Sequence, residues 1–153
     1  MNKMNKFVTF LIPCKKRLQD LKDTIVNIYQ QAERKNIVHV RCIIDKNDPI
    51  LEKKNEVLSI HPNITFYIND DLSLKYLQLS KLYYQATENI QSELFVFWGD
   101  RVRINTFGFD KILFFAFMNR KNNLFISTFK EIDTWNCAYP IITYQLNKIL
   151  NYK

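Results

Sequence analysis

The sequence predicts an α/β protein in which helices cover both faces of a mainly parallel sheet. Two kinds of pattern alternate along the chain: short apolar or β-branched runs, and longer segments whose apolar residues recur at helical spacing. The apolar runs stop abruptly at residues typical of turns, such as Pro13, Asp45 and Gly99. Because strands that alternate with helices form right-handed βαβ units, we expect a three-layer α/β/α sandwich.

The expected elements follow from these patterns in chain order. Residues 7–12 form an apolar run ended by a proline, and residues 38–44 alternate in polarity until Asp45. The pair Asp48-Pro49, a cap followed by a first-turn proline, opens a helix that runs to about residue 58. Residues 94–98 are continuously apolar, as expected for a strand buried on both faces. The remaining predicted strands are residues 64–68 and 124–129, and the remaining helices are residues 18–32, 76–86, 109–119 and a last one from about 143.

Length and composition indicate one folded domain that covers residues 1–153. A chain of 153 residues, 47% hydrophobic and 24% charged, is long enough for a single core. Gly99 and Gly108 are the two glycines, so the sequence contains no Gly-rich phosphate-binding loop. No apolar run approaches the roughly 18 residues that cross a bilayer, and no signal-peptide pattern follows Met1, so we expect a cytoplasmic protein.

The charge balance fits an anionic partner, and the enrichment in Lys and Asn fits an AT-rich genome equally well. A net charge of +7 and a pI near 9.3 fit nucleic acid, acidic lipid or a nucleotide pyrophosphate. The basic residues are scattered between carboxylates and do not form one stripe with exposed aromatic residues, which ranks nucleic-acid binding last. Cys14, Cys42 and Cys137 form no Cys-x-x-Cys pair, so we expect buried thiols rather than disulfides or a zinc site.

Polar residues follow four of the predicted strands. In parallel sheets, ligands bind outside the carboxyl ends of the strands. Three of these four ends are acidic, and they form the first functional signal in the sequence. The ends are Pro13-Cys14-Lys15, Asp45-Lys46-Asn47-Asp48, Asn69-Asp70-Asp71 and Gly99-Asp100-Arg101.

The segment from Phe97 to Ile112 carries the most specific motif. It resembles the hydrophobic-Gly-Asp-Asp-hydrophobic and Thr-x-Gly-aromatic-Asp signature of family 2-like glycosyltransferases. Segments near Pro13, Asp45, Leu74 and Pro140 resemble other parts of that family in the same order. The resemblance implies a single nucleotide-diphospho-sugar transferase domain with the GT-A, Rossmann-like fold.

The resemblance also implies roles for individual residues. It assigns the end of the first strand to a platform for the nucleotide base, the second acidic turn to uridine and ribose, and Asp100 to a divalent cation, Mn²⁺ or Mg²⁺, that bridges the diphosphate. Such a cation would stabilise the leaving diphosphate. The nucleotide-binding residues implied in this way are Pro13, Cys14, Arg17, Asp45, Asp48, Ser73 and Ser80.

Departures from the family pattern divide the functional hypotheses. Arg101 replaces the second carboxylate of the metal motif, and a lone carboxylate is a weak metal site. Either the Arg101 guanidinium does the cation's work on the diphosphate, or catalysis has been lost and a binding module remains. A general base would come from the late part of the chain, where Asp133 and Glu131 are the candidates.

The leading hypothesis is a glycosyltransferase that takes a UDP-sugar and an unknown glycan, lipid or protein acceptor. The alternatives are an inactive nucleotide-sugar or glycan-binding relative and, third, a basic nucleic-acid-binding protein. Structural roles compete at single residues: Asp48 as a helix cap, Asp45 as an acceptor for turn amides, and Asp100 as a plain turn residue. His39 lies in an alternating strand and is expected to be solvated or satisfied.

Overall fold

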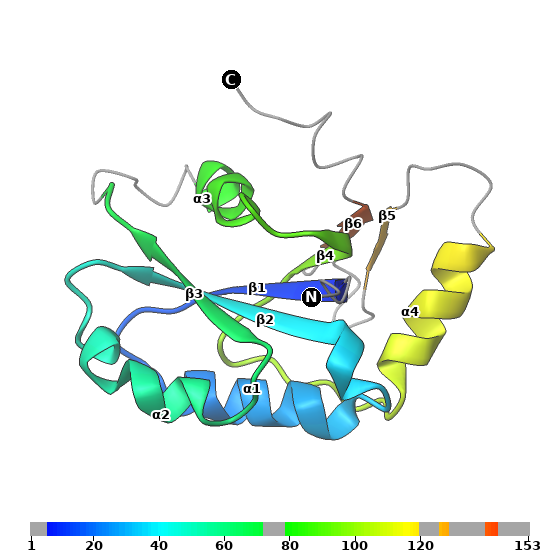
Figure 1. Ribbon diagram of the computed structural model, residues 1–153, viewed down its shortest axis with the longest axis horizontal. Helices are drawn as coiled ribbons and strands as arrows, with labels where there is room; N and C mark the ends of the chain where they lie inside the picture. The colour runs from blue at the N-terminus through cyan, green and yellow to red at the C-terminus, as the bar shows by residue number, and fades with distance from the viewer. Residues whose placement is uncertain (1–5, 72–78, 120–125, 129–139, 144–153) are drawn as a thin grey trace, which may run out of the picture.

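The computed structural model describes residues 6–71, 79–119, 126–128 and 140–143, and its elements alternate as the sequence predicts (Figure 1). The strands are β1 (Lys6–Pro13), β2 (Val38–Asp45), β3 (Ile64–Asn69), β4 (Ser92–Phe97), β5 (Ile126–Thr128) and β6 (Pro140–Thr143). The helices are α1 (Leu18–Gln31), α2 (Lys54–Leu58), α3 (Leu79–Ala86) and α4 (Phe109–Met118), with 3₁₀ turns η1 (Lys35–Ile37) and η2 (Pro49–Lys53).

The six strands form one sheet in the order β3-β2-β1-β4-β6-β5. The first four are parallel, with Val8 of β1 opposite both Val38 of β2 and Leu94 of β4. The chain builds β2 and β3 on one side of β1 and then crosses to place β4 on the other side. The strand order therefore reverses between β1 and β4, and in open α/β sheets that reversal is where ligands bind.

The two faces of the sheet are covered by different helices, which gives three layers (Figure 1). Alternation along β1 divides its side chains: Phe10 and Ile12 belong to the core beneath α1, α2 and α4, whereas Leu11 belongs to a smaller core beneath α3. All three side chains are fully buried. Because β1 is buried on both faces, it needs the nearly continuous apolar sequence that it has.

The face beneath α3 also holds a polar network around His39. Its Nδ1 lies 3.2 Å from the Thr9 hydroxyl of β1, and its Nε2 lies 2.9 Å from the Thr65 hydroxyl of β3. Burial, together with the positive charges of Lys6 and Arg41, lowers the pKa of His39 to about 4. The buried imidazole is satisfied in its neutral form, as expected for a polar group inside a sheet.

The last strand is the main departure from the predicted elements. Residues 140–143 form β6, a strand that the sequence did not predict, which pairs antiparallel with β4 and with β5. The helix predicted from about residue 143 begins where the described residues end. Residues 144–153 lie outside the described residues. The predicted strand 124–129 is described at Ile126–Thr128. Within the described part of the chain, no helix has the length and apolar character needed to cross a membrane.

Candidate functional site

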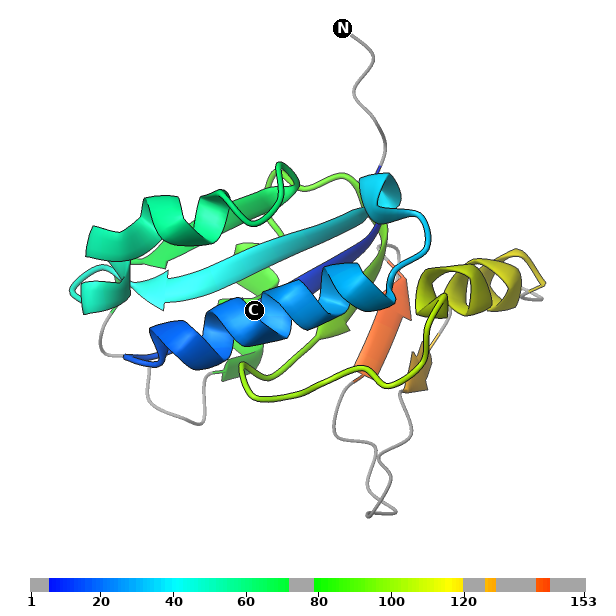
Figure 2. The ribbon, with the colours of Figure 1, turned by 90° about the horizontal axis from the view of Figure 1, so that it is seen from below.

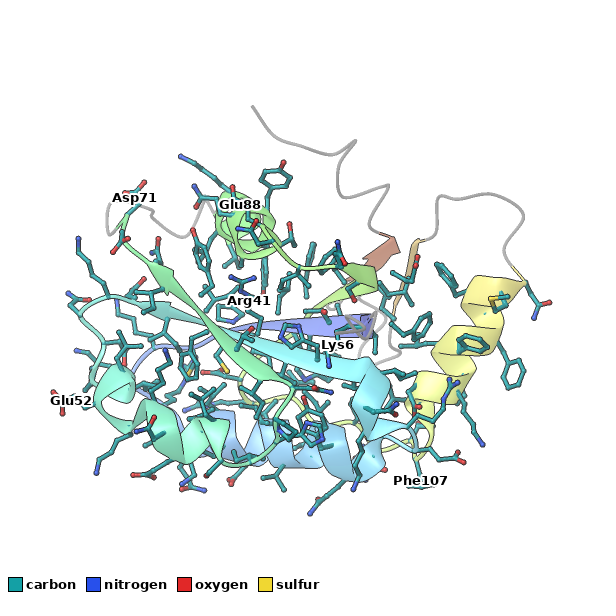
Figure 3. All side chains as sticks on the ribbon, viewed as in Figure 1. Lys6, Arg41, Glu52, Asp71, Glu88 and Phe107 are labelled. Carbon is teal, nitrogen blue, oxygen red and sulfur yellow. The ribbon has the colours of Figure 1, made fainter. Side chains whose placement is uncertain are left out.

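The carboxyl ends of the parallel strands form one edge of the sheet. Asp45 and Asp48 follow β2, Asn69 ends β3 and Asp100 follows β4, so the predicted convergence of these residues at one edge is confirmed. In Figure 3, Asp71 and Glu52 mark this edge, and Lys6 marks the opposite end of the sheet. The loops after β1 and β4 flank the point where the strand order reverses.

Asp100 is buried at that point and pairs with Arg17. The Arg17 guanidinium donates from Nε to Asp100 Oδ2 at 2.7 Å and from Nη2 to Oδ1 at 2.9 Å, a bidentate pair. The Asp100 side chain is 7% exposed, whereas that of Arg17 is 43% exposed. Asp100 raises the pKa of Arg17 further above its ordinary value. The pair therefore joins a buried negative charge to a positive charge that meets solvent.

Cys14 lies next to this pair and supports the loop. Its N–H donates to the Ile43 carbonyl at 3.1 Å, and its Sγ donates to the Arg17 carbonyl at 3.5 Å. Burial, followed by the hydrogen bond and negative charge of Asp100, raises the pKa of the Cys14 thiol to about 12. The thiol is therefore protonated at neutral pH and is not a nucleophile.

Asp48 holds two loops together. Its Oδ1 accepts from the Ile50 N–H at 2.9 Å, which is the cap of η2, and its Oδ2 accepts from the Lys16 N–H at 2.9 Å. Lys16 lies in the left-handed region, at φ 58°. Both oxygens of this buried carboxylate are thus engaged by backbone, which confirms the capping role and fixes the loop that carries Arg17.

Asp45 is oriented by a side chain that the sequence did not single out. The buried Asn69 donates from Nδ2 to Asp45 Oδ1 at 2.8 Å, and its Oδ1 accepts from the Asp71 N–H at 3.2 Å. Asp45 itself is half-buried. The amide at the end of β3 therefore fixes one carboxylate oxygen of Asp45 at the edge of the sheet.

Arg101 pairs with α1 and not with Asp100. Its Nε donates to Asp20 Oδ2 at 2.8 Å, in a pair whose side chains are 68% and 37% exposed. The guanidinium that contacts the Asp100 carboxylate belongs to Arg17. The sequence named both arginines, but their separation along the chain could not show which one reaches the carboxylate.

The segment between β4 and α4 runs alongside α1 (Figure 2). The Thr24 hydroxyl donates to the Asp100 carbonyl at 2.7 Å, and the Asn27 side chain bonds both backbone groups of Ile104. One turn later, the Gly108 N–H donates to the Gln31 carbonyl at 2.7 Å. Residues 24, 27 and 31 share one helical face. The polar side chains of Thr24 and Asn27 were the signal in the sequence for this contact, whereas Gln31 takes part through its backbone carbonyl.

Asp110, at the end of the same motif, is a structural residue. It is fully buried and accepts from the Glu33 and Arg34 N–H groups at 2.9 and 3.0 Å, beyond the last turn of α1. The Arg34 Nε lies 3.4 Å from the same carboxylate. Gly108 adopts φ 73°, a left-handed conformation that favours glycine. The Gly-aromatic-Asp half of the motif therefore joins α4 to α1.

The described residues do not fit a divalent cation. They contain no group of three or more His, Cys, Asp or Glu side chains that could hold a metal ion. Both carboxylate oxygens of Asp100 are bound by Arg17, and an arginine follows Asp100 in sequence. Of the other predicted site residues, Ser80 lies in α3, whereas Ser73 and Asp133 lie outside the described residues.

No protein-family model and no curated protein matches the sequence. Among solved structures, the mannosyltransferase PcManGT from Pyrobaculum calidifontis, in complex with GDP-Man and Mn²⁺, matches with a TM-score of 0.73. That match covers 94% of this chain and 46% of PcManGT, at 13% identity. The chain has the GT-A fold.

Two further structures support this GT-A assignment. TarS from S. aureus matches with a TM-score of 0.65 and 12% identity, over 85% of this chain and 37% of TarS. A cytidylyltransferase from Leptospira borgpetersenii matches with a TM-score of 0.59 and 12% identity, over 93% of this chain and 62% of that enzyme. This chain spans less than half of the two transferases, and at these identities the likeness concerns the fold.

Proposed function

We propose that this GT-A chain binds a nucleotide sugar at the carboxyl edge of its sheet and transfers the glycosyl group to a glycan, lipid or protein acceptor. The observation that carries the proposal is the buried Asp100 held by Arg17 where the strand order reverses. Burying a carboxylate beside a half-exposed guanidinium costs desolvation free energy that an ordinary turn does not require. Such an arrangement is typical of sites that bind charged ligands.

The ligands of the structural neighbours support a nucleotide sugar. PcManGT was solved with GDP-Man and Mn²⁺, and TarS was also solved with UDP. The strand ends of this chain offer chemistry of the same kind. Asp45, oriented by Asn69, can accept a ribose hydroxyl, and Arg17 can donate to phosphate oxygens. Pro13 then provides the surface beside the base, while the buried Cys14 supports the loop that carries Arg17. UDP is the nucleotide that the sequence motif favours.

Transfer also requires a base for the acceptor hydroxyl. Among the predicted site residues, Asp133 remains the candidate for that role. Asp48 contributes indirectly, because its contacts with the Lys16 and Ile50 amides fix the loop that precedes Arg17. The chain's own residues would therefore bind and orient the donor, with Asp45 and Arg17 at its two ends.

A binding protein without catalysis is the second candidate. Arg101 stands where the motif has its second carboxylate, and the Asp100 oxygens are already engaged. These two observations are what one expects if the edge has kept its affinity for a nucleotide and lost its chemistry. Both candidates should bind a nucleotide sugar, so only a measurement of turnover distinguishes the binding protein from the transferase.

Calorimetric titration with UDP, UDP-glucose, UDP-galactose and GDP-mannose tests the proposal. At least one should bind, and the Asp45→Asn and Arg17→Gln variants should each weaken that binding by about tenfold. Glu33→Gln is the matched control, because this exposed carboxylate lies beyond the opposite end of α1 from Arg17. The absence of nucleotide binding in the folded protein would reject the proposal. Release of free sugar or UDP from the bound donor would favour the enzyme over the binding protein.

A further inference from the structure

We infer that this edge holds the diphosphate without a metal ion, and that the Arg17 guanidinium supplies the positive charge. The inference rests on the proposed function, because it assigns the recognition of the diphosphate within that site. It differs from the hypothesis drawn from the motif, in which Arg101 takes the place of the metal ion and neutralises the diphosphate. The difference arises because Arg17, from the β1–α1 loop, reaches the carboxylate that the motif reserves for a metal.

Both oxygens of the Asp100 carboxylate are engaged by Arg17. A carboxylate that ligates Mn²⁺ or Mg²⁺ must direct at least one oxygen at the ion. Here Oδ1 and Oδ2 both accept from Arg17, at 2.9 and 2.7 Å, and the carboxylate is buried. A cation would have to displace two charge-assisted hydrogen bonds and then lie beside a guanidinium that has lost its partner.

A metal ion at Asp100 would also need further ligands. A single carboxylate does not make a Mn²⁺ or Mg²⁺ site, and the part of the chain described by the structure holds no cluster of three metal-binding side chains. Asp48 is engaged by two backbone N–H groups, and Asp45 has one oxygen bound to Asn69. Both oxygens of Asp48 and one oxygen of Asp45 are therefore engaged by other partners.

Arg17 keeps N–H donors for a ligand while it binds Asp100. A guanidinium has five N–H groups, and the pair with Asp100 uses two of them. The side chain remains 43% exposed, and the residue is also the N-cap position of α1, where no side chain caps the first N–H groups. The positive end of the 14-residue α1 helix therefore adds to the charge of Arg17.

Metal dependence of nucleotide binding is the first test. The dissociation constant of the nucleotide that binds best should change by less than about twofold between EDTA and millimolar Mn²⁺. Arg17→Gln should weaken nucleotide binding by about tenfold. Arg17→Lys keeps the charge but loses the bidentate guanidinium, so its affinity should lie between those of the wild-type protein and Arg17→Gln. Binding that requires Mn²⁺ in the wild-type protein would overturn the inference and leave the proposed function intact.

Direct uptake of Mn²⁺ tests the inference without any nucleotide. Electron paramagnetic resonance of free Mn²⁺ should show no stoichiometric binding by the wild-type protein or by Arg101→Asp, because Arg17 still covers Asp100. The double variant Arg17→Gln with Arg101→Asp should bind Mn²⁺, since it frees Asp100 and adds the second carboxylate of the motif. Thermal melting confirms that each variant is folded.

The outcomes separate the two claims. Wild-type uptake of Mn²⁺ that is lost in Asp100→Asn overturns the inference, whatever the nucleotide result. A folded double variant that takes up no Mn²⁺ overturns it as well, since Arg17 would then not be what excludes the ion. If no nucleotide binds, the proposed function fails. The Mn²⁺ measurement on the wild-type protein still decides whether Arg17, and not a metal ion, occupies the Asp100 carboxylate.

Discussion

Asp100 and Asp110 begin and end one motif, and both are buried carboxylates with an arginine partner. Asp110 is fully buried, and its oxygens accept from the backbone N–H groups of Glu33 and Arg34. The Arg34 guanidinium lies farther away, at 3.4 Å. Asp100 lies at the carboxyl edge of the sheet, and the side chain that binds it, Arg17, is partly exposed. The spacing of the motif gives no hint of this difference.

The two carboxylates differ in the groups that donate hydrogen bonds to them, and these donors distinguish the structural residue from the ligand-binding one. Backbone N–H groups beyond the end of a helix have no mobile alternative, so Asp110 is committed to joining α4 and α1. A guanidinium that meets solvent can bind a second anion while it keeps the first. We therefore expect substitutions at the two positions to affect different properties, stability at Asp110 and binding at Asp100.

The largest effect is expected from Asp110→Ala. The substitution leaves two backbone N–H groups and the Arg34 guanidinium without their acceptor. Loss of a buried acceptor costs about 1–3 kcal/mol for each donor left without a partner, so we expect the unfolding free energy to fall by about 3–5 kcal/mol. Urea denaturation measures it, with the exposed Asp23→Ala as the control for loss of a carboxylate on α1. A loss no larger than that of the control would remove Asp110 from its structural role.

Acid titration should reveal the next largest effect, which belongs to His39. Its pKa in the folded protein is about 4, below the ordinary value of 6.5. The unfolded chain therefore binds a proton on His39 at higher pH than the native protein does, and stability falls as the pH is lowered from about 6.5 to about 4. The loss over this window is at most about 3–4 kcal/mol, at 1.36 kcal/mol per pKa unit.

Measuring the unfolding free energy of wild type and His39→Gln between pH 7 and 4 checks this expectation. The variant should lose less stability over the window, because it has no imidazole to titrate. An equally steep curve in the variant would assign the acid sensitivity to other groups.

Asp100→Asn is expected to lower stability less than Asp110→Ala and to weaken nucleotide binding more. Arg17 can return to water when its partner is neutralised, so the loss of unfolding free energy should be about 1–2 kcal/mol. Affinity for the nucleotide should fall by about tenfold, since the guanidinium loses the carboxylate that orients it. Calorimetry and urea denaturation on the same sample report both values. Unchanged nucleotide affinity with a large loss of unfolding free energy would give Asp100 the same structural role as Asp110.

The smallest effect is expected from Arg101→Ala. Its pair with Asp20 is largely exposed, and such pairs contribute about 0–1 kcal/mol. Nucleotide affinity should stay within about twofold of the wild-type value, since the guanidinium at the carboxylate is that of Arg17. A tenfold loss of affinity would restore the hypothesis in which Arg101 faces the diphosphate. The titration should be repeated at raised ionic strength, where exposed pairs are screened.

The fold could be predicted largely because local patterns determine it. Buried parallel strands need continuous apolar runs, and the end of each run placed Asp45 and Asp100 at one edge of the sheet. Strand β6 could not be predicted in this way. It has four residues, begins with a proline and depends on pairing with β4, which is distant in sequence.

The site could be predicted only in part, for a related physical reason. The sequence identified Arg17 and Asp100 separately, but their bidentate pair depends on β1 and β4 being neighbours. The contribution of Asn69 was missed because an amide at a strand end is common in turns. Asp110 matched the motif as well as Asp100 did, and its structural role became visible only with the donors from Glu33 and Arg34.

The adjacency of β1 and β4 has a consequence for the order in which the chain can fold. During synthesis, β2 and β3 are available to pair on one side of β1 long before Ser92–Phe97 emerges to pair on the other side. At ordinary translation speeds that interval is about one to six seconds, and the open side of β1 exposes unpaired backbone groups throughout it. Such distant pairings slow folding. Arg17 therefore meets Asp100 only when residue 100 has left the ribosome, so the ligand-binding edge is completed among the last parts of the parallel sheet.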